Sequence, residues 1–289
     1  MIYIYTEQSK KKFFFDYINS IIYTYKNIYK NNEHGEIEII EDFNDLQIKI
    51  NQNHNKDRFL FLQNIPVHLN AQDKRIYLIN TEQLSKSEWV ERISNCPSNI
   101  KIIDYSLTNI QYLEPYRTPI YYLPYTVNSK EIMNLPKIYD ICTVMGCLGN
   151  YRSHILNQLI EKNIKYTSIE DKYGMERDEI LFQHKILLNI HFNERFKVFE
   201  EMRCNRCILN KMIVITQKSK TIENGGAFQK LRNHMIECEY DELVDTVIDV
   251  SNRYEEYYHK LFDNFNLKEI TQEYEKEFTN TFDEILLER

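Results

Sequence analysis

Short apolar runs alternate along the chain with segments whose apolar residues recur every three or four positions. In the first part of the chain the runs of strand length are MIYIY (1–5), EIEII (36–40), LQIKI (46–50), FLFLQ (59–63), IYLIN (76–80) and IKIID (100–104). The segments 11–29 and 87–94 have the periodicity of amphipathic helices. Strands that alternate with helices predict a parallel sheet covered by helices on both faces.

The same alternation continues in the second part of the chain. The pattern predicts a strand ending at Met145, a helix over 152–162, a strand from Ile164, a helix over 177–184, strands at 185–190 and 212–216 with a helix between them, and one long amphipathic helix over 241–265. We therefore expect a second parallel-sheet domain.

Proline and glycine mark the boundary between the two parts. Four of the six prolines fall within residues 115–136, and five of the six glycines follow them. Proline-rich stretches are typical of linkers between domains. We predict a first domain at 1–128, a hinge at 129–137, and a second domain with C-terminal helices at 138–289.

Composition narrows the class of protein. The net charge of -7 argues against a nucleic-acid partner, because no basic field replaces the phosphate counterions. No apolar run approaches the roughly 18 residues of a transmembrane helix, and the apolar N-terminal residues precede the lysines, the reverse of a secretory signal. We expect a cytoplasmic protein, in the host cytoplasm if the source is viral. Cys204 and Cys207 lack a second ligand pair, which favours buried thiols over a zinc site.

Candidate chemistry gathers where the strands of the second domain end. Ligands of open α/β sheets lie beyond the carboxyl ends of strands, where this chain has Gly146, Arg152 and His191. A glycine turn before a helix, with a cation, suits an anion such as a diphosphate. Structural explanations are equally open: a tight turn, an exposed helix arginine, a hydrogen-bonded core histidine, and an intrahelical pair of Glu200 with Arg203.

The order of several motifs resembles a known family. MGCLGNYR (145–152), YGMERDEI (173–180), KILLNIHF (185–192), EEMR (200–203) and LNKMIVIT (209–216) resemble the nucleotide-sugar-binding half of GT-B glycosyltransferases of the group 1 class, within a bacterial and giant-virus-like subgroup. LINTEQL (78–84), DYSLTNIQYL (104–113) and YLPY (122–125) resemble the first domain of that subgroup. The similarity covers roughly residues 76–260.

The resemblance implies two Rossmann-like domains that face a cleft, and transfer of a sugar from a nucleoside-diphosphate sugar to a glycan or small acceptor. The donor-binding residues that it implies are Gly146, Arg152, Lys185, Glu194, Glu200 and Arg203. It implies His191 facing the donor, Asn80 and Gln83 on the acceptor side, and Glu82 as general base. Such enzymes generally need no metal or other cofactor, so Arg152, Lys185 and backbone N–H groups are expected to stabilise the leaving diphosphate.

The chain departs from the group 1 pattern at two places. Many such enzymes carry two glutamates separated by seven residues, and the alignment of LNKMIVIT puts Val198 and Arg206 at those positions. Gln217 stands where the subgroup often has a glutamate at a strand end. These departures favour the alternative of an inactive sugar-nucleotide or glycan-binding module, whereas the retained strand-end residues favour an enzyme. A dinucleotide-dependent oxidoreductase is disfavoured because GxGxxG is missing.

Overall fold

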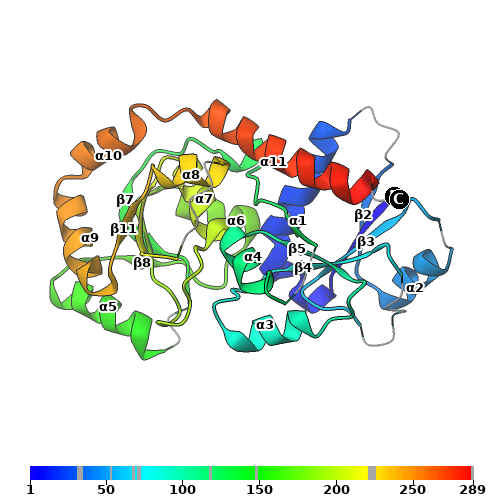
Figure 1. Cartoon of the computed structure of the whole chain (residues 1–289). Helices are drawn as coiled ribbons and strands as arrows, with labels where there is room; N and C mark the ends of the chain where they lie inside the picture. Colours follow the sequence, from blue (N-terminus) through cyan, green and yellow to red (C-terminus); the bar gives the residue numbers. More distant parts are fainter. Residues whose placement is uncertain are drawn as a thin grey trace. The chain divides into compact units, whose positions relative to one another are not determined.

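The computed structural model describes residues 1–30, 35–52, 54–66, 69, 73–116, 119–146, 149–220 and 226–287. Two compact units make up the chain (Figure 1). Unit 1 is Met1–Thr126 together with Tyr274–Arg289, and unit 2 is Val127–Glu273.

Unit 1 contains a sheet of six parallel strands in the order β2-β1-β3-β4-β5-β6. The strands are β1 Ile2–Tyr5, β2 Ile37–Ile40, β3 Arg58–Leu62, β4 Ile76–Asn80, β5 Lys101–Asp104 and β6 Ile120–Tyr122. Its helices are α1 Gln8–Ile28, α2 Phe43–Asn51, α3 Ser87–Ser94, α4 Leu107–Leu113 and the C-terminal part of α11 Leu267–Leu287. The strands β1, β3 and β4 are buried along their whole length, as expected for the centre of a parallel sheet covered on both faces.

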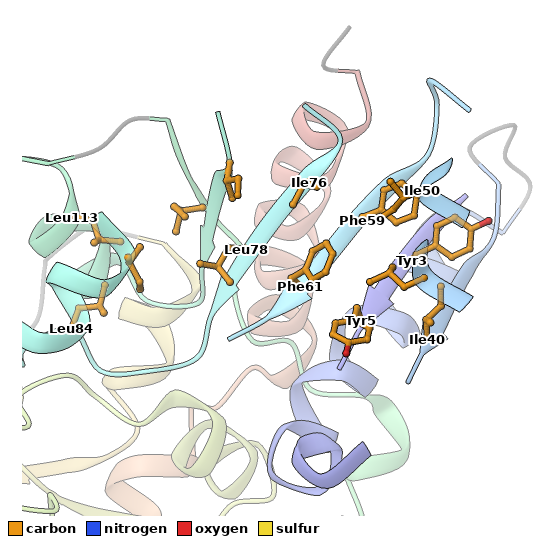
Figure 2. Packing of buried hydrophobic residues seen from close by; sticks show 14 residues of the cluster. Tyr3, Tyr5, Ile40, Ile50, Phe59, Phe61, Ile76, Leu78, Leu84 and Leu113 are labelled. Carbon is orange, nitrogen blue, oxygen red and sulfur yellow. The ribbon is translucent and has the colours of Figure 1, made fainter. Parts of the chain in front are cut away.

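Alternate residues of the strands form the core on one face of this sheet. Figure 2 shows Tyr3 and Tyr5 of β1 beside Phe59 and Phe61 of β3, and the rings of Tyr3 and Phe59 stack with centroids 5.2 Å apart. Residues two apart on a strand share a face, so this cluster continues through Leu78 on β4 to helices α2 and α3.

The opposite face of the sheet carries α1 and the end of α11. The Tyr77 hydroxyl, on β4, donates to the carbonyl of Ile285 at 3.3 Å. The rings of Tyr25 and Phe282 lie 5.5 Å apart, and Arg58 Nε donates to the same Ile285 carbonyl at 2.9 Å. The C-terminal segment is thus an integral part of unit 1.

One strand predicted in unit 1 is wrong. Residues 46–50 belong to α2, which begins where the Asp42 carboxylate accepts the backbone N–H groups of Asn44 and Asp45 at 2.8 and 3.1 Å. Leu46 and Ile50, four apart, are the buried residues of this helix, while the intervening Ile48 is 56% exposed. The N-cap therefore outweighs the apolar alternation.

Unit 2 contains five parallel strands in the order β11-β10-β9-β7-β8. The strands are β7 Tyr139–Thr143, β8 Thr167–Ser168, β9 His184–Asn189, β10 Ile213–Gln217 and β11 Ile236–Cys238. The helices are α5 Asn150–Glu161, α6 Gly174–Leu181, α7 Glu201–Leu209, α8 Ala227–Arg232, α9 Leu243–Asn252 and α10 Tyr254–Phe262. The predicted fold class, two parallel-sheet α/β units with C-terminal helices, is confirmed.

Two predicted helices of unit 2 are corrected by the structure. The single helix expected over 241–265 is two helices, α9 and α10, because the backbone leaves helical geometry at Arg253, where φ is -119° and ψ is 34°. The segment between β9 and β10 becomes helical only at Glu201, so residues 190–200 form an irregular connection.

The two units also differ from the division expected at 1–128, 129–137 and 138–289. The linker belongs to unit 2, because Arg206 pairs with Glu131 at 2.6 Å and Asn210 Nδ2 donates to the Glu131 carbonyl at 2.7 Å. The chain from Tyr274 onward belongs to unit 1 rather than to the second domain. Its contacts with the distant strands β3 and β4 leave no local signal in the sequence.

Candidate functional site

Arg152 joins the carboxyl ends of two neighbouring strands in unit 2. It lies in the first turn of α5 and is only 5% exposed. Its Nε donates to the carbonyls of Ile190 and His191, just beyond β9, at 3.0 and 3.3 Å. Its Nη1 donates to the carbonyl of Gly146, beyond β7, at 3.1 Å. The simple explanation of an exposed helix arginine is therefore wrong.

Two glycines leave open space beside the start of α5. Gly149, its N-cap, has a φ of 108°, a conformation that glycine adopts without steric cost. A Cβ atom at Gly146 or at Gly149 would meet nothing within 4 Å. A ligand can therefore approach this backbone closely, although Cys147 and Leu148 between the two glycines lie outside the described residues.

His191 links the end of β9 to the segment after β10. The imidazole is 1% exposed, and its Nε2 lies 3.2 Å from the hydroxyl oxygen of Ser219. Burial lowers the pKa of His191, and the charges of Arg203 and Arg152 lower it further against the opposing effect of Glu200. The ring is therefore neutral at pH 7 and acts as a hydrogen-bond partner rather than as a cation.

Glu200 and Arg203 form more than an isolated pair along a helix. Glu200 is the N-cap residue of α7, and its carboxylate pairs with the guanidinium of Arg203. Arg203 Nη1 also donates to Asn189 Oδ1 at 2.7 Å, and Asn189 Nδ2 donates to the hydroxyl oxygen of Thr216 at 3.0 Å. The pair is thus anchored to the ends of β9 and β10 while remaining partly exposed.

The strand ends of β7, β9 and β10 therefore make one connected cluster, formed by Gly146, Arg152, His191, Glu200 and Arg203. It combines two guanidinium groups with the start of a helix and an open glycine backbone. Cations and backbone N–H groups at a helix start stabilise phosphate groups. The arrangement suits a polyphosphate ligand.

Lys185, a residue expected at this site, lies apart from the cluster. Lys185 is the second residue of β9, so it lies at the amino edge of the parallel sheet, opposite the carboxyl ends. Its ammonium group pairs with Asp140 at 2.8 Å and lies 5.4 Å from the ring centroid of Tyr254. The structure does not bring Lys185 to Arg152, and Glu194 is an exposed residue of the connection after β9.

An aromatic pair beside the cluster has no distinguishing signal in the sequence. The rings of Tyr151 on α5 and Tyr240 stack 4.1 Å apart, and Gln217 Nε2, at the end of β10, donates to the Tyr151 hydroxyl oxygen at 2.8 Å. The carboxamide oxygen of Gln217 is buried without a hydrogen-bond partner among the described residues. With 22 tyrosines in the chain, residue type alone could not select these two.

A second polar network lies in unit 1, where β4 and β5 end. Asn80 Nδ2 donates to the Asp104 carboxylate at 2.6 Å and to the Glu82 carbonyl at 2.8 Å. Asn109 Nδ2 reaches the same two groups at 3.0 and 2.9 Å, and Asn109 Oδ1 accepts the backbone N–H of Leu84 at 2.8 Å. The segments LINTEQL and DYSLTNIQYL are therefore held together by hydrogen bonds.

Asp104 is the central acceptor of this network and was not among the predicted site residues. Its side chain is fully buried, and burial raises its pKa to about 7 despite hydrogen bonds from Asn80, the Ser106 backbone and Asn109. Asn80 and Gln83 are also buried, at 3% and 9% exposure. These residues support the loop from within.

The Glu82 side chain is the more accessible group of the loop. Its carboxylate accepts a hydrogen bond from Gln63 Nε2 at 2.5 Å, and burial raises its pKa above the ordinary value. A carboxylate with a raised pKa is a better proton acceptor at neutral pH than an ordinary one. Burial thus makes the Glu82 carboxylate more basic than an ordinary one.

Within the described residues, no group of three or more histidine, cysteine or acidic side chains could hold a metal ion. Cys204 and Cys207 are buried in α7, and burial raises the pKa of both thiols, as expected of structural cysteines. No helix within the described ranges is long and apolar enough to cross a membrane.

Solved structures identify the class of fold. A glycosyltransferase from Rickettsia africae ESF-5 is 11% identical, with a TM-score of 0.56 over 99% of this chain and 98% of the other. Anabaena Alr3699/HepE, solved in complex with UDP and glucose, is 9% identical, with a TM-score of 0.52 over 96% and 99%. The chain has the two-domain GT-B fold of these proteins. No family model matches the sequence.

Sequence relatives then identify the family. The uncharacterized protein L140 of Acanthamoeba polyphaga mimivirus is 30% identical over 255 residues, which cover 85% of this chain and 78% of L140. The uncharacterized protein R358 of the same virus is 30% identical over 74% of this chain and 78% of R358. The chain belongs to the family of L140 and R358. The uncharacterized protein L137 is 31% identical over 58% of the chain, which spans only 23% of L137.

Proposed function

We propose that the protein is a glycosyltransferase that moves a sugar from a nucleoside-diphosphate sugar to a glycan or small acceptor without a metal ion. The observation that carries the proposal is the connected cluster at the ends of β7, β9 and β10, in which Arg152 binds the backbone beyond two strands. Support also comes from the GT-B fold shared with HepE, whose structure contains UDP and glucose.

In this proposal the diphosphate lies at the start of α5, beside the open backbone of Gly146. Arg203, which is partly exposed, contacts the diphosphate. The positive charge of the buried Arg152 stabilises the leaving group electrostatically. Glu200 fixes the Arg203 guanidinium, and Glu194 contributes a polar contact from the connection after β9. Lys185 is left out because it lies at the other edge of the sheet.

His191 takes a positioning role in this proposal. Because the ring is 1% exposed and hydrogen-bonded to Ser219, it holds the two strand ends together instead of contacting the donor. Glu82 accepts the proton of the acceptor hydroxyl, and Asn80 and Gln83 support its loop on the acceptor side.

An inactive sugar-nucleotide or glycan-binding module is the second candidate, and one observation favours it. The two positions aligned with the glutamate pair of group 1 enzymes offer no carboxylate. Val198 is fully buried, and Arg206, 1% exposed, is paired with Asp178 and Glu131 at 3.1 and 2.6 Å. Ribose contacts must then come from other groups.

A panel of UDP-, GDP- and dTDP-sugars distinguishes these candidates. Thermal shift measures binding, because a ligand at 100 times its dissociation constant adds about 2.7 kcal/mol of stability. Release of the nucleoside diphosphate measures turnover. Turnover in the wild type that is lost in Glu82→Gln but kept in Glu91→Gln, an exposed position on α3, supports the enzyme.

Two other outcomes are informative. Donor binding without turnover, with any acceptor extract, identifies a binding module. If no nucleoside-diphosphate sugar in the panel binds, the transferase and a sugar-nucleotide-binding module are both refuted, and only a glycan-binding module is left.

A further inference from the structure

A cavity of about 330 Å³ lies within unit 1, beside the ends of β3 and β4 and against α3. This volume is at the lower end of the roughly 300–1,000 Å³ typical of small-molecule sites. Its described wall combines apolar residues such as Leu78, Trp89 and Ile93 with the polar side chains of Gln63 and Glu82. The cavity is therefore large enough for a small ligand and is not uniformly apolar.

Hydrogen-bonding capacity is left over in this wall. Gln63 Nε2 donates to one of the two carboxylate oxygens of Glu82 at 2.5 Å. The carboxamide oxygen of Asn64, also in the wall, is buried without a hydrogen-bond partner within the same residues. Buried polar atoms in native proteins normally have a partner, which can be a ligand or water. A hydroxyl group of a ligand would provide the missing donor.

Gln63 also has an unusual backbone for a residue that is not glycine. Its φ is 66°, in the left-handed region, which costs on the order of 1–3 kcal/mol and is concentrated at functional sites. The conformation is held by its backbone N–H, which donates to the Ile79 carbonyl at 2.9 Å, and by its amide, which donates to Glu82. The strain therefore fixes the Gln63 amide at the cavity.

The chemistry of the wall selects a class of ligand. Amide groups such as Gln63 and Asn95 both donate and accept, as hydroxyl groups do. The positive charges of Lys86 and Arg92 act on the Glu82 carboxylate, and the Arg92 guanidinium lies 5.0 Å from the ring centroid of Trp89. An apolar ligand would leave the polar groups unpaired, and an anionic ligand would face the Glu82 carboxylate. A polyhydroxylated, uncharged ligand fits best.

We infer that this cavity binds an uncharged saccharide, with one of its hydroxyl groups hydrogen-bonded to Glu82. Saccharide binding itself needs no donor. Only the role of the saccharide as the acceptor rests on the proposed function. In that role the hydroxyl group at Glu82 loses its proton to the carboxylate as its oxygen attacks the donor sugar, and the nucleoside diphosphate leaves. The network of Asn80, Asp104 and Asn109 holds Glu82 at this position.

The chain contains a built-in reporter of the cavity, because Trp89 is its only tryptophan. We expect a saturable change in tryptophan emission when the full chain, without any nucleotide, is titrated with glucose, galactose or their disaccharides. Glucuronic acid and glucose 6-phosphate serve as charged probes, and cyclohexanol as an apolar one. The neutral sugars should bind at least about tenfold more tightly than the charged probes, a difference of about 1.4 kcal/mol.

Two matched variants test whether the change in tryptophan emission comes from saccharide binding in the cavity. Asn95→Ala removes a wall amide outside the proposed catalytic groups and should weaken saccharide binding about tenfold, while Asn51→Ala, an exposed position of unit 1 on α2, should leave it unchanged. Circular dichroism confirms that both variants fold. An emission change caused only by charged or apolar probes, or by none, overturns the inference.

The proposed function and this inference can fail separately. Turnover of a nucleoside-diphosphate sugar without any saccharide response at Trp89 refutes the saccharide cavity and leaves the transferase. A saccharide response in a chain that binds no nucleoside diphosphate supports the cavity and refutes the transferase.

Discussion

Replacing Arg152 by lysine should remove hydrogen bonds that connect the segments after β7 and β9, while preserving the positive charge. The guanidinium reaches the carbonyls of Ile190 and His191 with Nε and the carbonyl of Gly146 with Nη1. A lysine ammonium is a single donor centre and cannot serve both ends of this fork. At least one bond from a charged donor is lost, at about 1.5–3 kcal/mol. Loss of the contact with the Phe192 ring, 5.4 Å away, adds about 0.5–1 kcal/mol. The expected cost in the free energy of unfolding is therefore about 2–4 kcal/mol.

Urea unfolding followed by far-ultraviolet circular dichroism measures this loss. Trp89 lies in unit 1, so tryptophan emission follows that unit separately. Hydrogen exchange should also become faster at residues 189–193. The control is Arg195→Lys, a like substitution at an exposed position of the connection after β9, which should stay within about 0.5 kcal/mol. An Arg152→Lys protein as stable as that control would show that Arg152 does not hold the strand ends together.

Three further predictions concern other parts of the chain. Asp104→Asn places an amide donor opposite the donors of Asn80 and Asn109 and should destabilise unit 1 by about 1–3 kcal/mol in urea unfolding. Burial raises the pKa of Asp104 to about 7. The stabilising contribution of Asp104 is therefore complete below the unfolded pKa near 4 and is lost as the pH rises through about 7. The variant should lose more stability at about pH 5 than at about pH 8, and the opposite order would contradict this assignment. Arg206→Met removes the ion pairs with Glu131 and Asp178 and should cost unit 2 about 3 kcal/mol, whereas an unchanged urea midpoint would show that these ion pairs do not hold the linker. Donor turnover should be unchanged by EDTA, because arginine side chains and a helix start neutralise the diphosphate in the proposal; loss on chelation, restored by Mg²⁺ or Mn²⁺, would contradict metal independence.

The sequence predicted the elements whose pattern is local and strong. The parallel strands β3, β4, β9 and β10 are continuous apolar runs, and helix α3 was predicted with its observed bounds, 87–94. At residues 46–50 the prediction was wrong, because a cap at Asp42 determines the structure there. The return of the C-terminal segment to unit 1 depends on long-range contacts such as Arg58 with Ile285, which no local pattern encodes.

The candidate site was predictable in its position more than in its contacts. The rule that ligands bind beyond the carboxyl ends of strands selected Gly146, Arg152 and His191, and the structure joins them. That same rule excludes Lys185, which only the resemblance had placed there, because it begins its strand. Asp104 could not be identified as the buried centre of a network, since burial and hydrogen-bond partners are properties of the fold.

The central claim, that a nucleoside diphosphate binds at the carboxyl edge of unit 2, is tested most directly by hydrogen exchange with and without UDP. The account predicts UDP-dependent protection of residues 149–153 at the start of α5 and of residues 190–203 between β9 and α7. The amino edge around Lys185 and all of unit 1 should be unaffected. Protection confined to unit 1, or to residues around Lys185 and Tyr254, would contradict the account.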